Sequence, residues 1–107
     1  MIEEQAIVVS ITAGTSAEAE QLAQLLVERH LAACVQILPA MTSVYRWQGS
    51  VQRETEILLL AKTLQRNFAE LEQTVRENHS YKVPEIMAIR AEAVSESYFE
   101  WLSENVK

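Results

Sequence analysis

The ten residues 54–63, ETEILLLAKT, predict a β-strand that is apolar on both faces at its centre. Successive side chains of a strand point to opposite faces. One face would carry Ile57, Leu59 and Ala61. The other would carry Glu54, Glu56, Leu58, Leu60 and Lys62. Such a strand needs cover on both sides, so we expect helices on one face and something else on the other.

A strand and a helix are predicted at the start of the chain. Residues 6–12, AIVVSIT, form a short β-branched run that ends at Gly14. Thr15 or Ser16 can then cap a helix. The basic residues 29–30 suit the negative end of a helix dipole, so we expect the helix to end there. Its apolar stripe consists of Ala19, Leu22, Ala23 and Leu26.

The segment before residues 54–63 has strand character and contains a hairpin. Residues 31–38, LAACVQIL, predict a strand that continues past Pro39 to residue 45. Proline removes a donor from the hydrogen-bond ladder, so Pro39 predicts an edge position, a bulge or a bend. Residues 45–54, YRWQGSVQRE, predict a hairpin around residues 48–50.

A helix, a strand and a final helix are predicted after residue 63. The first helix has Leu64, Phe68, Leu71 and Val75 as its stripe. Residues 85–92, EIMAIRAE, predict the strand, and Ser95 or Ser97 can cap the final helix. We expect three side chains of this helix to face inward: Tyr98, Trp101 and Leu102.

The order of these elements predicts an α+β fold with one domain over residues 1–107. The order β-α-β-β-α-β is that of the ferredoxin-like arrangement, to which a C-terminal helix is added. The face of the sheet without helices would be apolar at Leu58 and Leu60, and monomers rarely expose a large apolar patch. The second and third strands are also too long to be paired along their whole length within so small a sheet. We therefore expect a closed homo-oligomer in which these strands pair with a neighbour.

Composition disfavours two classes of partner and favours one location. The net charge is −6 at pH 7, all fifteen acids are glutamate, and the nine basic residues are scattered, so no basic stripe predicts nucleic-acid binding. The N-terminal run is acidic where a secretory signal is basic, and it is too short to span a membrane. A single cysteine, Cys34, fits a reducing cytoplasm. We expect Cys34 to be a small buried core residue.

Five runs resemble the CutA family, the divalent-cation tolerance proteins, in their order and spacing. They are LAACVQILP, SVYRWQG, EILLLAKT, HSYKVPEI and YFEWL. The resemblance covers nearly the whole chain. It implies a ferredoxin-like subunit in a tight homotrimer, with long strands extending between subunits as in the PII-type signalling proteins. It also implies a link to tolerance of copper and other divalent metals.

The family's copper-binding pattern is only partly present. That pattern joins a cysteine near the end of the first strand to two adjacent histidines before a proline–tyrosine pair. Here Ile11, Asn78 and Ser80 replace the cysteine, one histidine and the proline, and only His79 is retained as a possible metal ligand. The alternative for His79 is a structural role at a helix end, bonded to backbone.

The resemblance implies a cleft between subunits as the binding site. We expect it to be built from Trp47, Glu56, Lys62, His79, Tyr81 and Glu85 and to take a divalent metal ion, copper among them, or a small anion. Glu56 and Lys62 share a strand face, but six residues separate them by about 20 Å. Trp47, beside the hairpin, suits interface packing.

Two further classes of function are weighed against this one. The alternative is a structural trimer that docks another protein and has no small-molecule site. An enzyme ranks lowest because the sequence has no nucleophile–base pair, phosphate loop or cofactor motif, so we expect no catalytic activity.

Overall fold

The computed structural model describes residues 2–107 as one sheet with helices on one side. The elements in chain order are η1 (Ile2–Glu4), β1 (Ala6–Ala13), α1 (Ser16–Glu28), β2 (Cys34–Ile37), β3 (Met41–Trp47), β4 (Ser50–Leu64), η2 (Gln65–Asn67), α2 (Phe68–Glu77), β5 (Ile86–Arg90) and α3 (Glu96–Glu104). No helix in this range is long and apolar enough to cross a membrane.

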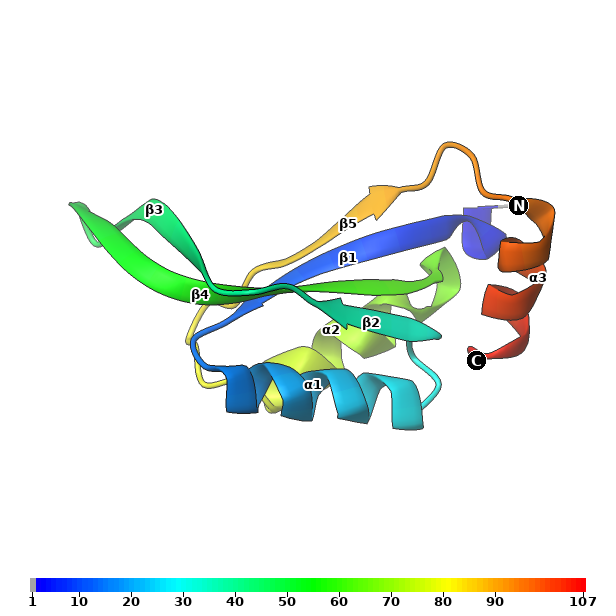
Figure 1. Cartoon of the computed structure of the whole chain (residues 1–107), viewed down its shortest axis with the longest axis horizontal. Coiled ribbons are helices and arrows are strands. Elements are labelled where there is room, and N and C mark those ends of the chain that lie inside the picture. Colours follow the sequence, from blue (N-terminus) through cyan, green and yellow to red (C-terminus); the bar gives the residue numbers. More distant parts are fainter. Residues whose placement is uncertain (1) are drawn as a thin grey trace.

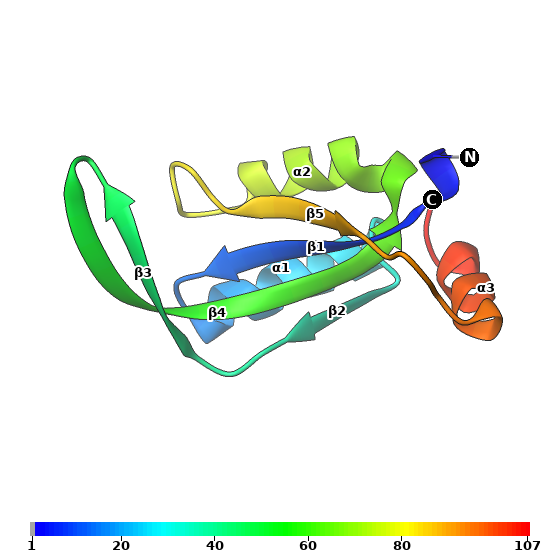
Figure 2. The same ribbon diagram turned by 90° about the horizontal axis from the view of Figure 1, so that it is seen from above.

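The sheet is antiparallel throughout, with the strand order β2-β4-β1-β5 and with β3 paired to the free end of β4. Because each neighbouring pair is antiparallel, β1 and β2 run in the same direction with β4 between them. Helices α1 and α2 both lie on one face of this sheet (Figure 1), and α3 lies at the end opposite the β3–β4 hairpin (Figure 2). The expected α+β class is confirmed.

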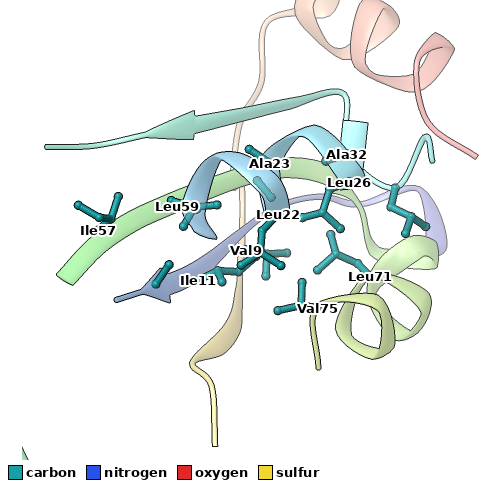
Figure 3. Close-up of a cluster of buried hydrophobic side chains, with 14 of the residues drawn as sticks. Val9, Ile11, Leu22, Ala23, Leu26, Ala32, Ile57, Leu59, Leu71 and Val75 are labelled. Atoms are coloured by element: carbon teal, nitrogen blue, oxygen red, sulfur yellow. The ribbon is translucent and has the colours of Figure 1, made fainter. Parts of the chain in front are cut away.

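The core lies between the sheet and the two helices (Figure 3). From β1 and β4 it takes Val9, Ile11, Ile57, Leu59 and Ala61, and from α1 it takes Ala19, Leu22, Ala23 and Leu26. The predicted faces of residues 54–63 and the predicted stripe of α1 are thus confirmed. For α2 the stripe holds at Phe68, Leu71 and Val75. Leu64 is instead the last residue of β4, and it packs with Ala6 and Leu102 in a second cluster.

The expected single strand from residue 31 to residue 45 is wrong, because it is two strands. Residues 38–40 interrupt it, and Pro39 lies at the centre of the break. Proline cannot donate to the ladder, so the chain bends there. As a result β4 pairs with β2 over Leu59–Lys62 and with β3 over Ser50–Glu56.

The β3–β4 hairpin projects from the sheet as an arm (Figure 2). Its turn is at Gln48 and Gly49, which both have positive φ (48° and 83°). Two consecutive left-handed residues suit the right-handed twist of the strands they join. The predicted hairpin around residues 48–50 is confirmed.

Helix α3 turns a different face inward than expected. Leu102 of α3 belongs to the second cluster, and Phe99, three residues before it, packs against that cluster, as does Val106 beyond the end of the helix. Tyr98 and Trp101 are therefore exposed within this chain, although Leu102 is buried as predicted. Cys34 is half-buried rather than a core residue, because it pairs across the sheet with Lys62 on the face away from α1 and α2.

Candidate functional site

The sheet face without helices is largely apolar and only partly covered. Cross-strand pairing aligns Ser10 with Leu60 and Met87 on this face. The next row contains Val8, Lys62 and Ile89. Met87 and Ile89 are 54% and 57% exposed. Exposed apolar side chains that lie together mark a surface that binds another molecule.

Glu56 lies where β4 leaves the sheet to form the arm. It pairs with Met41 of β3, and only 8% of the residue is exposed. Its Oε2 accepts a hydrogen bond from the Tyr81 hydroxyl at 2.8 Å. Within residues 2–107 no basic side chain forms an ion pair with Glu56 and no donor bonds its Oε1. A buried carboxylate normally has a cation or a metal beside it.

Tyr81 is a neutral hydrogen-bond donor to this carboxylate. Burial raises the pKa of Tyr81, and the hydrogen bond to Glu56 and the charge of Glu56 raise it further. The ring also lies close to the backbone of Gly14, where an added Cβ would be 3.2 Å from the hydroxyl oxygen. A side chain at position 14 would therefore push Tyr81 away from Glu56.

His79 uses both ring nitrogens in hydrogen bonds to backbone. Nε2 is 2.7 Å from the Thr12 carbonyl oxygen, and Nδ1 is 3.0 Å from the amide nitrogen of Tyr81. Because a carbonyl only accepts and an amide N–H only donates, Nε2 carries the proton and Nδ1 is the acceptor. This geometry is that of the structural alternative. A metal ion could bind His79 only after one of these bonds is broken.

Glu18, from the first turn of α1, is a site residue that the sequence did not reveal. Its carboxylate accepts hydrogen bonds from the amide and the hydroxyl of Ser80, at 2.8 and 3.0 Å. Burial opposes ionisation of this group, but the hydrogen bonds from Ser80 and smaller favourable effects together outweigh it and lower the pKa of Glu18. The only sequence signal is a glutamate three residues after a helix cap, which normally indicates a local contact.

The six expected cleft residues do not all meet within one chain. Glu56, His79 and Tyr81 lie together, since the rings of His79 and Tyr81 are 4.7 Å apart. Glu85 lies farther along the sheet, where its carboxylate accepts a hydrogen bond from Ser10 at 2.7 Å.

Trp47 and Lys62 lie near opposite ends of β4, Trp47 beside its first residue on β3 and Lys62 in the part that pairs with β2. Trp47 is in the arm, 41% exposed, and pairs with Ser50. Lys62 donates a hydrogen bond to Gln36 on the neighbouring strand. Because Trp47, Glu56 and Lys62 occupy positions of the same parity in the ladder, they share one face of the ribbon.

The described chain does not assemble a metal site by itself. No group of three or more His, Cys, Asp or Glu side chains within residues 2–107 is placed to hold a metal ion. Ile11 is fully buried in the core. The position at which the copper pattern has a cysteine thus serves packing here.

Comparison with known protein families identifies the chain. The family model described as CutA1 divalent ion tolerance protein matches residues 7–105. The chain belongs to the CutA1 family. The "Divalent-cation tolerance protein CutA" of Thermus thermophilus is 46% identical over 98 residues, which are 92% of this chain and 95% of that protein.

Other relatives extend the comparison. The "Protein CutA, chloroplastic" of Arabidopsis thaliana is 41% identical over 101 residues, and the chain spans only 56% of its length. The solved structure of the Thermus protein has a TM-score of 0.93, with 95% of this chain and 99% of that chain covered. The Archaeoglobus fulgidus structure, named a periplasmic divalent cation tolerance protein, has a TM-score of 0.92 at 36% identity, with 95% and 99% covered.

Proposed function

We propose that this CutA1 chain is a ferredoxin-like subunit of a homotrimer that binds a divalent cation at Glu56, in a cleft between subunits, and so contributes to tolerance of copper and other divalent metals. The observation that carries the proposal is the Glu56 carboxylate: it is 8% exposed, held at one oxygen by Tyr81, and without a cationic partner among residues 2–107. The Oε1 atom of this half-enclosed carboxylate has no hydrogen-bond donor within residues 2–107, so a cation from outside the chain would stabilise it.

Assembly is supported by two apolar surfaces that one chain leaves uncovered. One is the sheet face with Met87 and Ile89, and the other is the face of the projecting arm that carries Tyr45 and Trp47. A closed assembly buries both at once, because each subunit can present its arm to the next. Glu56 lies between the two surfaces, where the arm begins, so a neighbour that packs on the arm also closes the space beside Glu56.

The local charge favours a cation over the small anion. Besides Glu56 itself, the Glu18 carboxylate lies close to this site, because it holds Ser80, the residue next to Tyr81. Lys62 is the only one of the expected residues that would attract an anion, and it is engaged with Gln36 at the other end of β4. A small anion would therefore need a basic group from the partner subunit.

A trimer that docks another protein is the second candidate. Tyr98 and Trp101 on α3 are exposed, and their rings lie 5.5 Å apart. Exposed aromatic side chains of this kind anchor protein interfaces. In this case the neighbour's own basic side chain would neutralise Glu56, and no metal would bind.

The two candidates are separated by titrating metal-stripped protein with Cu²⁺, Zn²⁺ and Mn²⁺ in a calorimeter. The first predicts saturable binding of one ion per subunit and its loss in Glu56→Gln. Glu54→Gln is the matched control, because Glu54 is exposed on the same face and should bind normally. Only weak heat without fixed stoichiometry, or equal loss in both variants, would contradict the cation site.

The size of the assembly is tested separately by sedimentation. We expect a trimer at micromolar concentration, and a folded monomer under these conditions would overturn the architecture. We also propose that the protein is not an enzyme and that it acts in the cytoplasm. Relatives named periplasmic and chloroplastic make fractionation of the native cell the direct test of location.

A further inference from the structure

The loop between α2 and β5 is tied to three different elements at three successive residues. His79 donates to the Thr12 carbonyl at the end of β1. Ser80 donates to Glu18 of α1, and Tyr81 donates to Glu56 of β4. Tyr81 is thus aimed at Glu56 by a loop whose middle residue is held by α1.

The Glu18 side chain leaves the local contact that its sequence position favours. The pattern from Thr15 to Glu18 is that of a capping box, in which the glutamate bonds back to the amide of the cap residue. The first half of the box is made, since the Thr15 hydroxyl accepts from the Glu18 amide at 3.1 Å. The carboxylate instead turns to Ser80, which is 62 residues away in the chain.

Both carboxylate oxygens are used in this contact. Oε2 accepts from the Ser80 amide at 2.8 Å, and Oε1 accepts from the Ser80 hydroxyl at 3.0 Å. Hydrogen bonds to an ionised acceptor are the stronger kind. Two of them to one residue fix its direction as well as its place. On either side of Ser80, the His79 ring packs against the Tyr81 ring, and the Tyr81 hydroxyl lies close to Gly14.

We propose that Glu18 is a positioning residue for the cation site: by holding Ser80 it keeps the Tyr81 hydroxyl on Oε2 of Glu56, so that Oε1 faces the ion. The inference rests on the proposed function for the part that concerns the ion. The other part of the inference, that Glu18 fixes the positions of His79 and Tyr81, rests only on the hydrogen bonds described above.

The test uses Glu18→Gln, which keeps the size of the side chain and removes its charge. Glu20→Gln is the matched control, because Glu20 lies in the same helix, is exposed, and makes no side-chain hydrogen bond or ion pair in the described chain. Ser80→Ala is the second variant, since it removes the hydroxyl bond and keeps the amide bond. The Thr15 cap remains in all three proteins, so each should fold, and circular dichroism checks this.

Two measurements report the conformation of the loop in the absence of any metal: the tautomer of His79 and the exchange rate of the Ser80 amide. The ¹⁵N spectrum of the histidine ring reports the tautomer, and a His30→Asn variant assigns the signals because the chain has two histidines. In the wild type we expect one fixed tautomer of His79 with the proton on Nε2. In Glu18→Gln we expect averaged ring signals and about tenfold faster exchange of the Ser80 amide. Ser80→Ala should lie between the two, and Glu20→Gln should equal the wild type.

The third readout is the affinity for Cu²⁺, Zn²⁺ and Mn²⁺, each titrated separately. We expect Glu18→Gln to raise the dissociation constant about tenfold, which is the scale of one lost hydrogen bond to a charged group. Unchanged ring signals and Ser80 exchange in Glu18→Gln would overturn the inference. A changed loop with wild-type affinity would overturn the positioning role. If the wild type binds none of the ions, the Glu56 proposal fails on its own, and the ring and amide signals still decide whether Glu18 holds the loop.

Discussion

The two halves of β4 have similar strand geometry and opposite environments. Residues 57–64 alternate between the helix-covered core and the open face, and Ile57, Leu59 and Ala61 are buried. Residues 50–55 pair only with β3, and all but Gln52 are exposed. Hydrogen bonding to β3 can therefore extend β4 beyond the core, but the side chains of the extended part stay exposed within one chain. Glu56 lies at the boundary, which explains how a carboxylate is buried there without an ion pair to any of residues 2–107.

The largest expected difference between the halves is in the stability of the subunit. Leu59→Ala removes a fully buried side chain from the centre of the core, so we expect a loss of about 3 kcal/mol in the free energy of unfolding. Val51→Ala in the arm is the matched change and should cost well under about 1 kcal/mol. Urea unfolding at one protein concentration measures both, because assembly adds to apparent stability. Equal losses would mean that the arm belongs to the same cooperative core.

Substitutions in the arm half of β4 and its partner β3 should instead change how the subunits associate. Trp47→Ala removes a large exposed aromatic side chain, and we expect it to weaken subunit association by about 2 kcal/mol, or roughly thirtyfold, while circular dichroism stays unchanged. Sedimentation of a dilution series measures the change. Thr42→Ala, on the other face of the same strand, is the control. If the subunits of both variants dissociate at the same protein concentration, Trp47 is not an interface anchor.

The boundary between the halves should show a pH signature. Tyr81 has its pKa raised in the folded protein by burial and by Glu56, above an ordinary value of about 10. Above pH 10 the unfolded chain loses this proton before the folded protein does, so stability is complete below pH 10 and falls as the pH rises. We expect Tyr81→Phe to reduce stability at pH 7 by about 1.5 kcal/mol and to flatten the alkaline loss. Thermal unfolding from pH 7 to 11 tests this, and an equally steep alkaline loss in Tyr81→Phe would contradict it.

The sequence predicted the parts of the fold that depend on short-range periodicity. The alternation of residues 54–63 and the stripe of α1 required only local patterns. The break at Pro39 was open to three interpretations, and the choice of a bend depends on which partner β4 meets on each side of it. The inward face of α3 was predicted wrongly because Tyr98, Phe99, Trp101 and Leu102 offer two apolar stripes, and only tertiary packing selects one.

The candidate site was harder to predict because its contacts are long-range. Tyr81 and Glu56 are 25 residues apart, and His79 and Thr12 are 67 apart. Glu18 was missed since its spacing from Thr15 indicates a local cap, and nothing in the sequence reveals that its carboxylate turns to Ser80. Of the six expected cleft residues, Glu56, His79 and Tyr81 lie together in the structure, while Trp47 and Lys62 stay apart within one chain.

The smallest expected effect lies at the tip of the arm. Gly49 has φ of +83°, and no atom lies within 4 Å of where its Cβ would be, so Gly49→Ala meets backbone strain but no clash. We expect a local cost of about 1 kcal/mol. Gln48→Gly is the reverse change, because Gln48 already holds a left-handed conformation that glycine adopts freely.

Hydrogen exchange distinguishes a local effect at the tip from a global one. In Gly49→Ala the arm amides should exchange faster while those paired between β1 and β4 keep their wild-type rates, and Gln48→Gly should not speed either set. Faster exchange in β1 would show that the turn is coupled to the core, and that the two halves of β4 unfold together. Unchanged core exchange means that the arm can rearrange on a neighbour without disturbing the subunit that carries it.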